Sequence, residues 1–271
     1  MRVRSFAILL LCLSITASAA KADSSFDTKP ALDLGVATGA AGMGAALSLL
    51  RMATREVPAE CVRGPCGSSR SDGARPYNAT WNALSYGTVS LAIAGGFAPS
   101  SARAASGEYG ASGLGDASTM MAQAIGVTYA LTEIVKTAAP RPRPFLAWPP
   151  AGDDTSARSS PDAVASYLSG HTSFAFAAAS VGTFDACRAP GPLGCMGPAI
   201  GLHALATATA AGRVLAGKHH VSDVIAGAGI GAAVGTAVSM LHAPAGREQG
   251  VDGGRAIAAS QGMMLSMMFL W

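Results

Sequence analysis

Charged and aromatic residues are both scarce in this 271-residue sequence. Asp, Glu, Lys and Arg make up 13% of the chain, against about 25% in an average soluble domain. Half of the residues are hydrophobic, which excludes an intrinsically disordered chain, and so few charges argue against a broad basic surface for nucleic acid. Only 6% are aromatic, while glycine occurs 33 times. The shortage of aromatic and β-branched residues disfavours a sheet, and the small residues indicate closely packed helices.

The first 22 residues have the pattern of a secretory signal peptide. Two arginines precede an apolar run over residues 6–15, and small residues follow at 17–20. We expect cleavage between Ala19 and Asp23, and therefore an exported protein in the periplasm or cell envelope; an uncleaved anchor helix is the alternative. Removal takes away three of the 19 basic residues and no acidic one, which leaves 16 of each sign. Net charge therefore indicates no nucleic-acid partner.

Four cysteines remain in the exported chain, namely Cys61, Cys66, Cys187 and Cys195. In an oxidising compartment this number suggests two disulfides. Pairing between near neighbours would close two small loops, but the sequence does not fix the connectivity. A metal site is less favoured, because neither near pair has CxxC spacing and no histidine is close.

Six apolar segments of helical length are separated by loops rich in Pro, Gly, Ser and charge. They cover residues 31–50, 83–98, 117–136, 172–186, 197–212 and 222–242. The sequence thus predicts an all-α fold, a bundle of about six helices. We expect a mobile loop over 99–116. The chain divides into N-terminal helices and loops (23–115), a core that carries the motifs described below (116–245) and a C-terminal tail (246–271). The tail is either a β-hairpin strand, a membrane-touching end or a segment packed on the bundle.

Membrane insertion is an open alternative for this bundle. The first and last segments contain charge-free stretches just long enough to cross a membrane. Gly227, Gly231 and Gly235 repeat every four residues, which would let two helices approach closely. The other segments are short or interrupted by polar side chains such as Glu133, and Ala and Gly give little drive for insertion. We therefore favour a water-soluble or peripheral bundle over an integral one.

A first cationic motif ends the third apolar segment. Lys136 is followed by Arg141 and Arg143 in a proline-stiffened stretch. Arginine suits bidentate binding of phosphate oxygens, and lysine adds a point charge. A charged helix end next to such a turn is also a common solvated feature, so this motif alone is weak.

A second motif opens the fourth segment. Ser169, Gly170 and His171 directly precede an apolar run, as residues at a helix N-terminus do. Free backbone N–H groups and the helix dipole favour an anion there. His171 would face that anion and could give or take a proton. A helix cap with a nearby surface histidine is the alternative.

A third motif, with Arg213, His219 and Asp223, opens the last segment. His219 and Asp223 are four residues apart, which places them on one face of a helical turn. An Asp that accepts a hydrogen bond from one imidazole nitrogen leaves the other nitrogen as a nucleophile, and Arg213 would add a cation. Spacing alone leaves His220 as an alternative partner of Asp223. A satisfied His–Asp pair without a catalytic role is equally compatible with the isolated pattern.

In this order the three motifs resemble the superfamily of type 2 phosphatidic-acid phosphatases, bacterial class A acid phosphatases and vanadium haloperoxidases. That superfamily has the pattern K-x6-R-P, then P-S-G-H, then S-R-x5-H-x3-D, and the resemblance covers roughly residues 117–242. The matching residues are Lys136, Arg143, Pro144, Ser169, Gly170, His171, Arg213, His219 and Asp223. The pattern also selects His219 over His220. Leu168 stands in place of the motif proline and Gly212 in place of the motif serine; neither replaced residue does chemistry in the family.

The resemblance implies a metal-independent phosphomonoesterase whose catalytic core is residues 116–245. His219 would attack phosphorus to form a phosphohistidine, Asp223 would orient it, and His171 would protonate the leaving oxygen and then activate water. The phosphate oxygens would be held by Lys136, Arg143, Ser169, Gly170 and Arg213. No cofactor is expected, and vanadate would act as an inhibitor because it resembles phosphate.

The expected partner is a phosphorylated lipid such as phosphatidic acid, or a small soluble phosphomonoester, with membrane association left open. One alternative is a vanadium-dependent haloperoxidase with vanadate as its cofactor. Another is a non-catalytic envelope protein with a vestigial site, which only the departures at Leu168 and Gly212 support. The remaining histidines in the apolar segments, His203 and His242, are interpreted as structural.

Overall fold

The computed structural model describes residues 26–66, 75–108, 111–150, 152, 155–188 and 192–243. The predicted signal peptide (1–22) and C-terminal tail (246–271) lie outside the described residues. Within these ranges the chain is helical and has no β-sheet, which confirms the predicted all-α fold.

Among the described residues, six long helices correspond one for one to the predicted apolar segments. They are α2 (Pro30–Thr54), α4 (Ala79–Gly96), α6 (Ala111–Ala138), α8 (Gly170–Ala186), α9 (Pro192–Leu215) and α10 (Val221–Leu241). Shorter elements are α3 (Ala59–Arg63), α5 (Ala98–Ala105), η2 (Pro144–Ala147), α7 (Thr155–Arg158) and η4 (Pro161–Val164). The expectation of a loop over 99–116 is wrong, because α5 fills its first part. Its proline lies in the first turn, where the missing N–H breaks no helical hydrogen bond.

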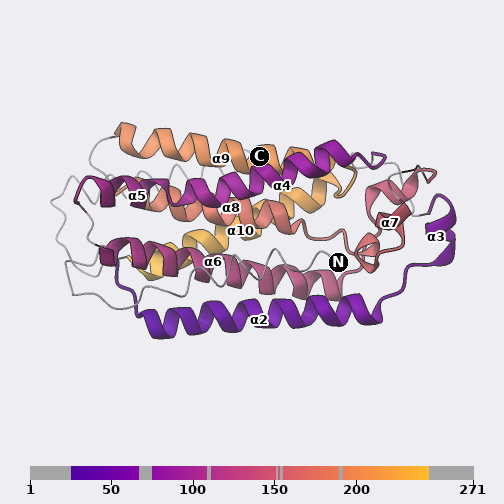
Figure 1. Cartoon of the computed structure of the whole chain (residues 1–271), viewed down its shortest axis with the longest axis horizontal. Coiled ribbons are helices and arrows are strands. Elements are labelled where there is room, and N and C mark those ends of the chain that lie inside the picture. Colours follow the sequence, from indigo (N-terminus) through magenta and orange to yellow (C-terminus); the bar gives the residue numbers. More distant parts are fainter. Residues whose placement is uncertain are drawn as a thin grey trace.

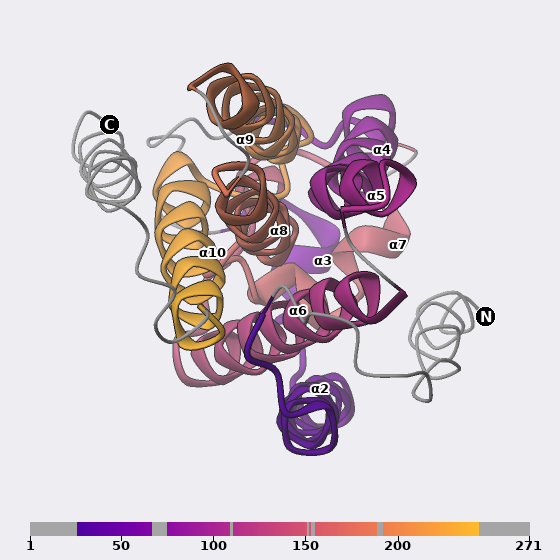
Figure 2. The same cartoon turned by 90° about the vertical axis from the view of Figure 1, so that its left-hand side faces the viewer.

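Helix α8 lies at the centre of the bundle. It packs against α4, α6, α9 and α10, while α2 packs on the outer side of α6 (Figures 1 and 2). The sequence of α8 explains this position, because its small side chains allow close neighbours on all sides. Ala175, Ala177, Ala178 and Ala179 are completely buried.

Three glycines bring α10 against the backbone of α8. Gly227, Gly231 and Gly235 all face it, and a Cβ added to Gly227 would lie 2.8 Å from the carbonyl oxygen of Ser169. The predicted close approach of two helices is therefore present. It also joins the N-termini of the two helices, where the Ser169 backbone N–H donates to the Asp223 carbonyl oxygen over 3.2 Å.

The outward faces of the long helices are free of charge. Among their described residues, no Asp, Glu, Lys or Arg is exposed, whereas a surface helix of a soluble protein usually carries charge on its outer face. Leu32, Leu49 and Leu50 on α2 are each more than half exposed. Two helices, α2 and α10, are long and apolar enough to cross a membrane, by length and composition only.

Both near-neighbour cysteine pairs form disulfides, Cys61–Cys66 and Cys187–Cys195. They lie at opposite ends of the bundle, the first at α3 and the second between α8 and α9 (Figure 1).

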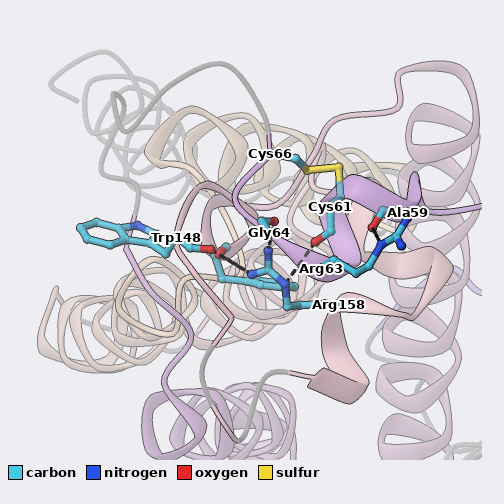
Figure 3. Close-up of a disulfide and its surroundings, with 8 residues drawn as sticks. Ala59, Cys61, Arg63, Gly64, Cys66, Trp148 and Arg158 are labelled. Carbon is cyan, nitrogen blue, oxygen red and sulfur yellow. Dashed lines mark hydrogen bonds between the residues drawn. A yellow bond between two sulfur atoms is a disulfide. The ribbon is translucent and has the colours of Figure 1, made fainter.

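The completely buried Arg158 holds the turn closed by the first disulfide (Figure 3). Its guanidinium donates to the carbonyl oxygens of Cys61, Gly64 and Trp148. It also donates to the carbonyl of Phe145, so the turn is tied to the segment that follows Arg143.

Candidate active site

The three motifs lie at the same end of the bundle. This end is formed by the last turn of α6, the first turn of α8 and the connection from α9 to α10, with residues 139–169 running between α6 and α8 (Figure 1). Backbone hydrogen bonds hold this connecting segment in place. Arg143 N–H donates to Ala163 over 2.8 Å, and Arg141 and Ala165 form a parallel bridge.

His219 is almost fully buried, and both of its ring nitrogens have a partner. Nδ1 lies 2.7 Å from the carbonyl oxygen of Ser166, and Nε2 lies 3.1 Å from Nη1 of Arg143. A carbonyl only accepts and a guanidinium only donates. The proton is therefore on Nδ1, and the lone pair of Nε2 faces the arginine. This is the tautomer that a nucleophilic Nε2 requires.

Asp223 lies close to His219 but is not its direct partner. Its Oδ2 is 3.7 Å from His219 Nδ1, beyond hydrogen-bonding distance. The carboxylate instead accepts from the Arg141 guanidinium, from the Ser166 hydroxyl and, over 2.9 Å, from the backbone N–H of His220. Asp223 is therefore linked to the imidazole indirectly, because the Ser166 hydroxyl donates to Asp223 while the Ser166 carbonyl faces His219 Nδ1.

Arg143 is held by several groups at once and is 4% exposed. Its Nε donates to the Asp162 carbonyl over 2.8 Å, and its Nη2 donates to the Asp162 carboxylate over 2.6 Å. Nη1 donates to the carbonyl of Lys218 over 2.7 Å as well as facing His219. These contacts fix the plane of the guanidinium beside Nε2 of His219.

Lys136 reaches the first turn of α8. Its Nζ donates to Oε1 of Glu133 over 3.0 Å, and a Cβ built on Gly170 would lie 3.6 Å from the same Nζ. The hydroxyl of Ser169 shares a 2.9 Å hydrogen bond with Thr172. A lysine ammonium and the N-terminus of a long helix thus meet at one place, which favours an anion there.

Arg213 is oriented by α4. Its Nη1 donates to Asn82 Oδ1 over 2.9 Å and to Ser85 Oγ over 3.1 Å. The ring of Tyr86 lies 5.9 Å from its guanidinium carbon. Gly212 allows this arrangement, because a Cβ there would lie 3.1 Å from that of Ser85. At this departure from the motif, the hydroxyl beside Arg213 comes from α4.

His171 lies among the same groups, in the first turn of α8. Its ring meets that of Tyr86 edge to face, with centroids 4.4 Å apart. Burial, followed by the charge of Arg213, holds the pKa of His171 well below 6.5. All eight predicted site residues are therefore brought together at one end of the bundle.

The electrostatics of this end are those of a cationic site. Burial and then the charges of Arg143 and Arg213 hold the pKa of His219 well below 6.5. Burial and the nearby Arg143 lower the pKa of Arg213 to about 10. Burial alone would raise the pKa of Asp162, but Arg143 and Lys136 keep it far below its usual value. An anion placed among these cations would relieve their mutual repulsion.

His203 and His242 have other surroundings. His203 Nδ1 lies 2.9 Å from the Ala199 carbonyl within α9, and His242 Nε2 lies 2.7 Å from Gln123 Oε1 at the other end of the bundle. No group of three or more His, Cys, Asp or Glu residues that could hold a metal ion occurs in the described ranges.

Sequence reasoning missed several residues that hold the site. They are Arg51, Asn82, Ser85, Tyr86, Glu133, Asp162 and Ser166. Ser166 lies three residues before the second motif, so proximity could have pointed to it. Arg51 and the α4 residues lie far from every motif, and no pattern in their surroundings distinguishes them.

Residues 118–247 match the model of the PAP2 superfamily. This region of the chain belongs to the superfamily. Searches of curated proteins and of solved structures gave no match. PAP2 proteins are generally phosphatases or related hydrolases, so the family indicates phosphatase-type chemistry. All three motifs fall within the matched region, whereas α2 and α4 lie outside it.

Proposed function

We propose that this PAP2 protein hydrolyses phosphomonoesters through a phosphohistidine on His219. One observation carries the proposal: the Ser166 carbonyl holds the Nδ1 proton of His219, while the Nε2 lone pair faces the cationic Arg143. A phosphate on Arg143 would thereby present its phosphorus to a nitrogen that is already deprotonated.

In the first step, Nε2 of His219 forms a bond to phosphorus, and the bond from phosphorus to the ester oxygen breaks. Lys136, Arg143 and Arg213 would stabilise the charge on the phosphoryl oxygens, because phosphoryl transfer depends mainly on positioning and electrostatics. The phosphorylated imidazole is cationic, and the carboxylate of Asp223 at 3.7 Å offsets that charge.

His171 would provide the proton for the departing oxygen. In the free protein, burial and then the neighbouring cations lower its pKa. The negative charge of a bound phosphate opposes the effect of the cations, so proton uptake accompanies substrate binding. Neutral His171 would then take a proton from the water that attacks the phosphohistidine. Phosphate leaves, and His219 returns with its lone pair on Nε2.

A lipid phosphate is the substrate that the surface favours. The helices around the site have charge-free outer faces, and exposed Trp81, Leu84 and Tyr86 lie on α4, whose first turns hold Arg213. Such apolar surface suits contact with an acyl chain or a membrane interface. The disulfides support export, because disulfides persist in oxidising compartments. Since they lie at opposite ends of the bundle, both ends would be in such a compartment, which favours a bundle that does not cross the inner membrane.

The test is phosphate release by the mature protein, in excess EDTA, beside His219→Ala. Activity that survives EDTA and is lost in the variant is expected, together with an acid-labile phosphoenzyme in the parent. Equal activity of parent and variant would refute the mechanism. Comparing phosphatidic acid in micelles with a soluble aryl phosphate then tests the substrate, and better turnover of the soluble ester would refute the lipid preference. Halide oxidation that needs added vanadate and peroxide would instead indicate a haloperoxidase.

A further inference from the structure

Helix α2, which precedes the region matched by the family model, carries a buried arginine that points toward the site. The Arg51 side chain is 3% exposed, and its Nη2 lies 2.9 Å from Oε2 of Glu133. The other oxygen of this carboxylate, Oε1, lies 3.0 Å from Nζ of Lys136. One buried carboxylate is therefore shared between Arg51 and a cation of the first motif.

The same arginine is also linked to Arg143 of that motif. Nη1 of Arg51 lies 3.4 Å from Oδ1 of Asp162, whose Oδ2 lies 2.6 Å from Nη2 of Arg143. The charges thus alternate along a chain of contacts that runs from Lys136 through Arg51 to Arg143, with a carboxylate between each pair of cations.

A second arginine fixes α2 against the last turn of α6. Arg55 donates to the backbone carbonyls of Lys136 over 3.2 Å and of Thr137 over 2.9 Å. Carbonyls at a helix end lack partners within the helix, so Arg55 supplies them from α2. The end of α2 is thereby bound to both the backbone and the side-chain network of Lys136.

We infer that Arg51 is a positioning residue for the phosphate site: by sharing two carboxylates, it leaves Lys136 and Arg143 with positive charge available for the phosphate. Without Arg51, the whole negative charge of Glu133 would offset Lys136, and the whole negative charge of Asp162 would offset Arg143. Less positive charge would then be left for the phosphate. Burial strengthens this effect at Glu133, whose side chain is 4% exposed, because water screens charges only weakly where it is excluded. The inference rests on the proposed function only in naming phosphate as the anion.

The first measurement compares Arg51→Met with the parent protein. We expect the Kd for inorganic phosphate, from titration calorimetry, to rise about tenfold, which corresponds to roughly 1.4 kcal/mol. KM for an aryl phosphate should rise by a similar factor while kcat changes less, because the chemistry at His219 is untouched. Arg51→Lys, which keeps the charge, should recover most of the affinity.

The second measurement tests the shared carboxylate directly. In the double variant Arg51→Met/Glu133→Gln, residue 133 no longer carries a negative charge that offsets Lys136. Phosphate should therefore bind more tightly than to Arg51→Met alone. Glu133→Gln by itself should lower the Kd for phosphate. A purely structural role for Arg51 predicts no such recovery. An unchanged or higher Kd in Glu133→Gln would overturn the inference even if Arg51→Met did not fold.

Arg103→Met is the matched control. Arg103 is also a buried arginine, 3.8 Å from Asp185 and 3.6 Å from Glu108, but lies at the other end of the bundle. Its loss should lower the thermal midpoint as Arg51→Met does, yet leave phosphate affinity unchanged. Equal Kd values for the parent and a folded Arg51→Met would overturn the inference.

The same titrations separate this inference from the proposed function. Phosphate binding by a parent that hydrolyses no ester would refute the proposed function and leave the role of Arg51 to be decided by the affinities. Absence of phosphate binding by the parent would overturn the inference, whatever the hydrolysis assays gave.

Discussion

At the end of the bundle away from the motifs, buried charges are matched by their neighbours. Asp185 accepts a hydrogen bond from Ser100 and lies 3.8 Å from Arg103. His242 has Gln123 at 2.7 Å on one ring nitrogen and a backbone carbonyl at 3.1 Å on the other. These groups are as buried as those of the site, and their contacts join neighbouring helices to each other and to the segment before α2.

At the motif end, the same kinds of residues are arranged with an excess of positive charge. Lys136 and Arg143 share their carboxylates with Arg51, and Arg213 is held by neutral side chains of α4. Burial alone therefore does not distinguish a site from a structural polar cluster. The difference is that the motif end has an excess of cations, one of which, Arg143, is fixed toward a histidine lone pair. Substitutions there should therefore affect activity before stability.

The largest contrast is expected between the two buried histidines. His219→Ala should lower kcat on the order of 10⁴-fold or more, because it removes the proposed nucleophile. His242→Ala should leave kcat and KM unchanged and lower stability by about 1–3 kcal/mol, since buried partners such as Gln123 lose a hydrogen bond. Initial rates and chemical unfolding of both variants provide the measurement. Comparable losses of activity in the two would remove the distinction between the ends.

A smaller contrast is expected between two arginines that each lie against an aromatic ring. Arg213→Ala should reduce kcat/KM by about 10²–10³-fold, by analogy with the loss of an oxyanion donor. Arg188, whose guanidinium carbon lies 4.3 Å from the centroid of the Phe26 ring at the other end, is the control, and Arg188→Ala should keep full activity. If Arg213→Ala changed only the thermal midpoint, it would belong with the structural cluster.

The pH profile sharpens the comparison further. The proposed mechanism needs a neutral His219 and a protonated His171, and burial together with the surrounding cations lowers the pKa of both below 6.5. kcat/KM reports the free enzyme, so it should rise with pH through the pKa of His219 and fall through that of His171. The maximum therefore lies below pH 6.5. Arg213→Met should move it toward neutrality because a neighbouring positive charge is lost, whereas Arg188→Met should not, and a maximum above pH 7 in the parent would contradict the assignment.

The fold was predictable because the sequence separates its apolar segments clearly. Pro, Gly and charged residues divide six stretches of helical length, and the glycines at 227, 231 and 235 have the spacing that α8 and α10 use to pack. The segment 99–116 was misjudged, since Ser, Ala and Gly suit a loop as well as a short helix. Here α5 is stabilised by tertiary contacts of Ser100 and Arg103 that local composition does not reveal.

The grouping of the site residues was predictable from the resemblance of the three motifs to a known superfamily, but the residues that support them were not. The partner of His219 Nδ1 is a backbone carbonyl, which has no sequence pattern, and so Asp223 was expected in the place that Ser166 occupies. Arg51 and Asn82 come from helices outside the family match. Only the packing of α2 on α6 and of α4 on α9 brings them to the site.

The smallest expected contrast is between the two disulfides. Their sequence separations are 5 and 8 residues, and loops of this size should each contribute about 2 kcal/mol on chain-entropy grounds. Cys61→Ser/Cys66→Ser and Cys187→Ser/Cys195→Ser should therefore lower stability by similar amounts.

Only the loss of the first disulfide, in Cys61→Ser/Cys66→Ser, should also reduce kcat/KM, by a few-fold. The turn that it closes is hydrogen-bonded to Leu146, and the Arg158 contacts tie it to the segment after Arg143. Parallel unfolding and activity measurements on both double variants test this. Because removing either disulfide should lower stability by a similar amount, any difference in activity between the two variants reports the position of the disulfide relative to the site. Equal activities would mean that the packing around Arg143 holds the segment without the disulfide.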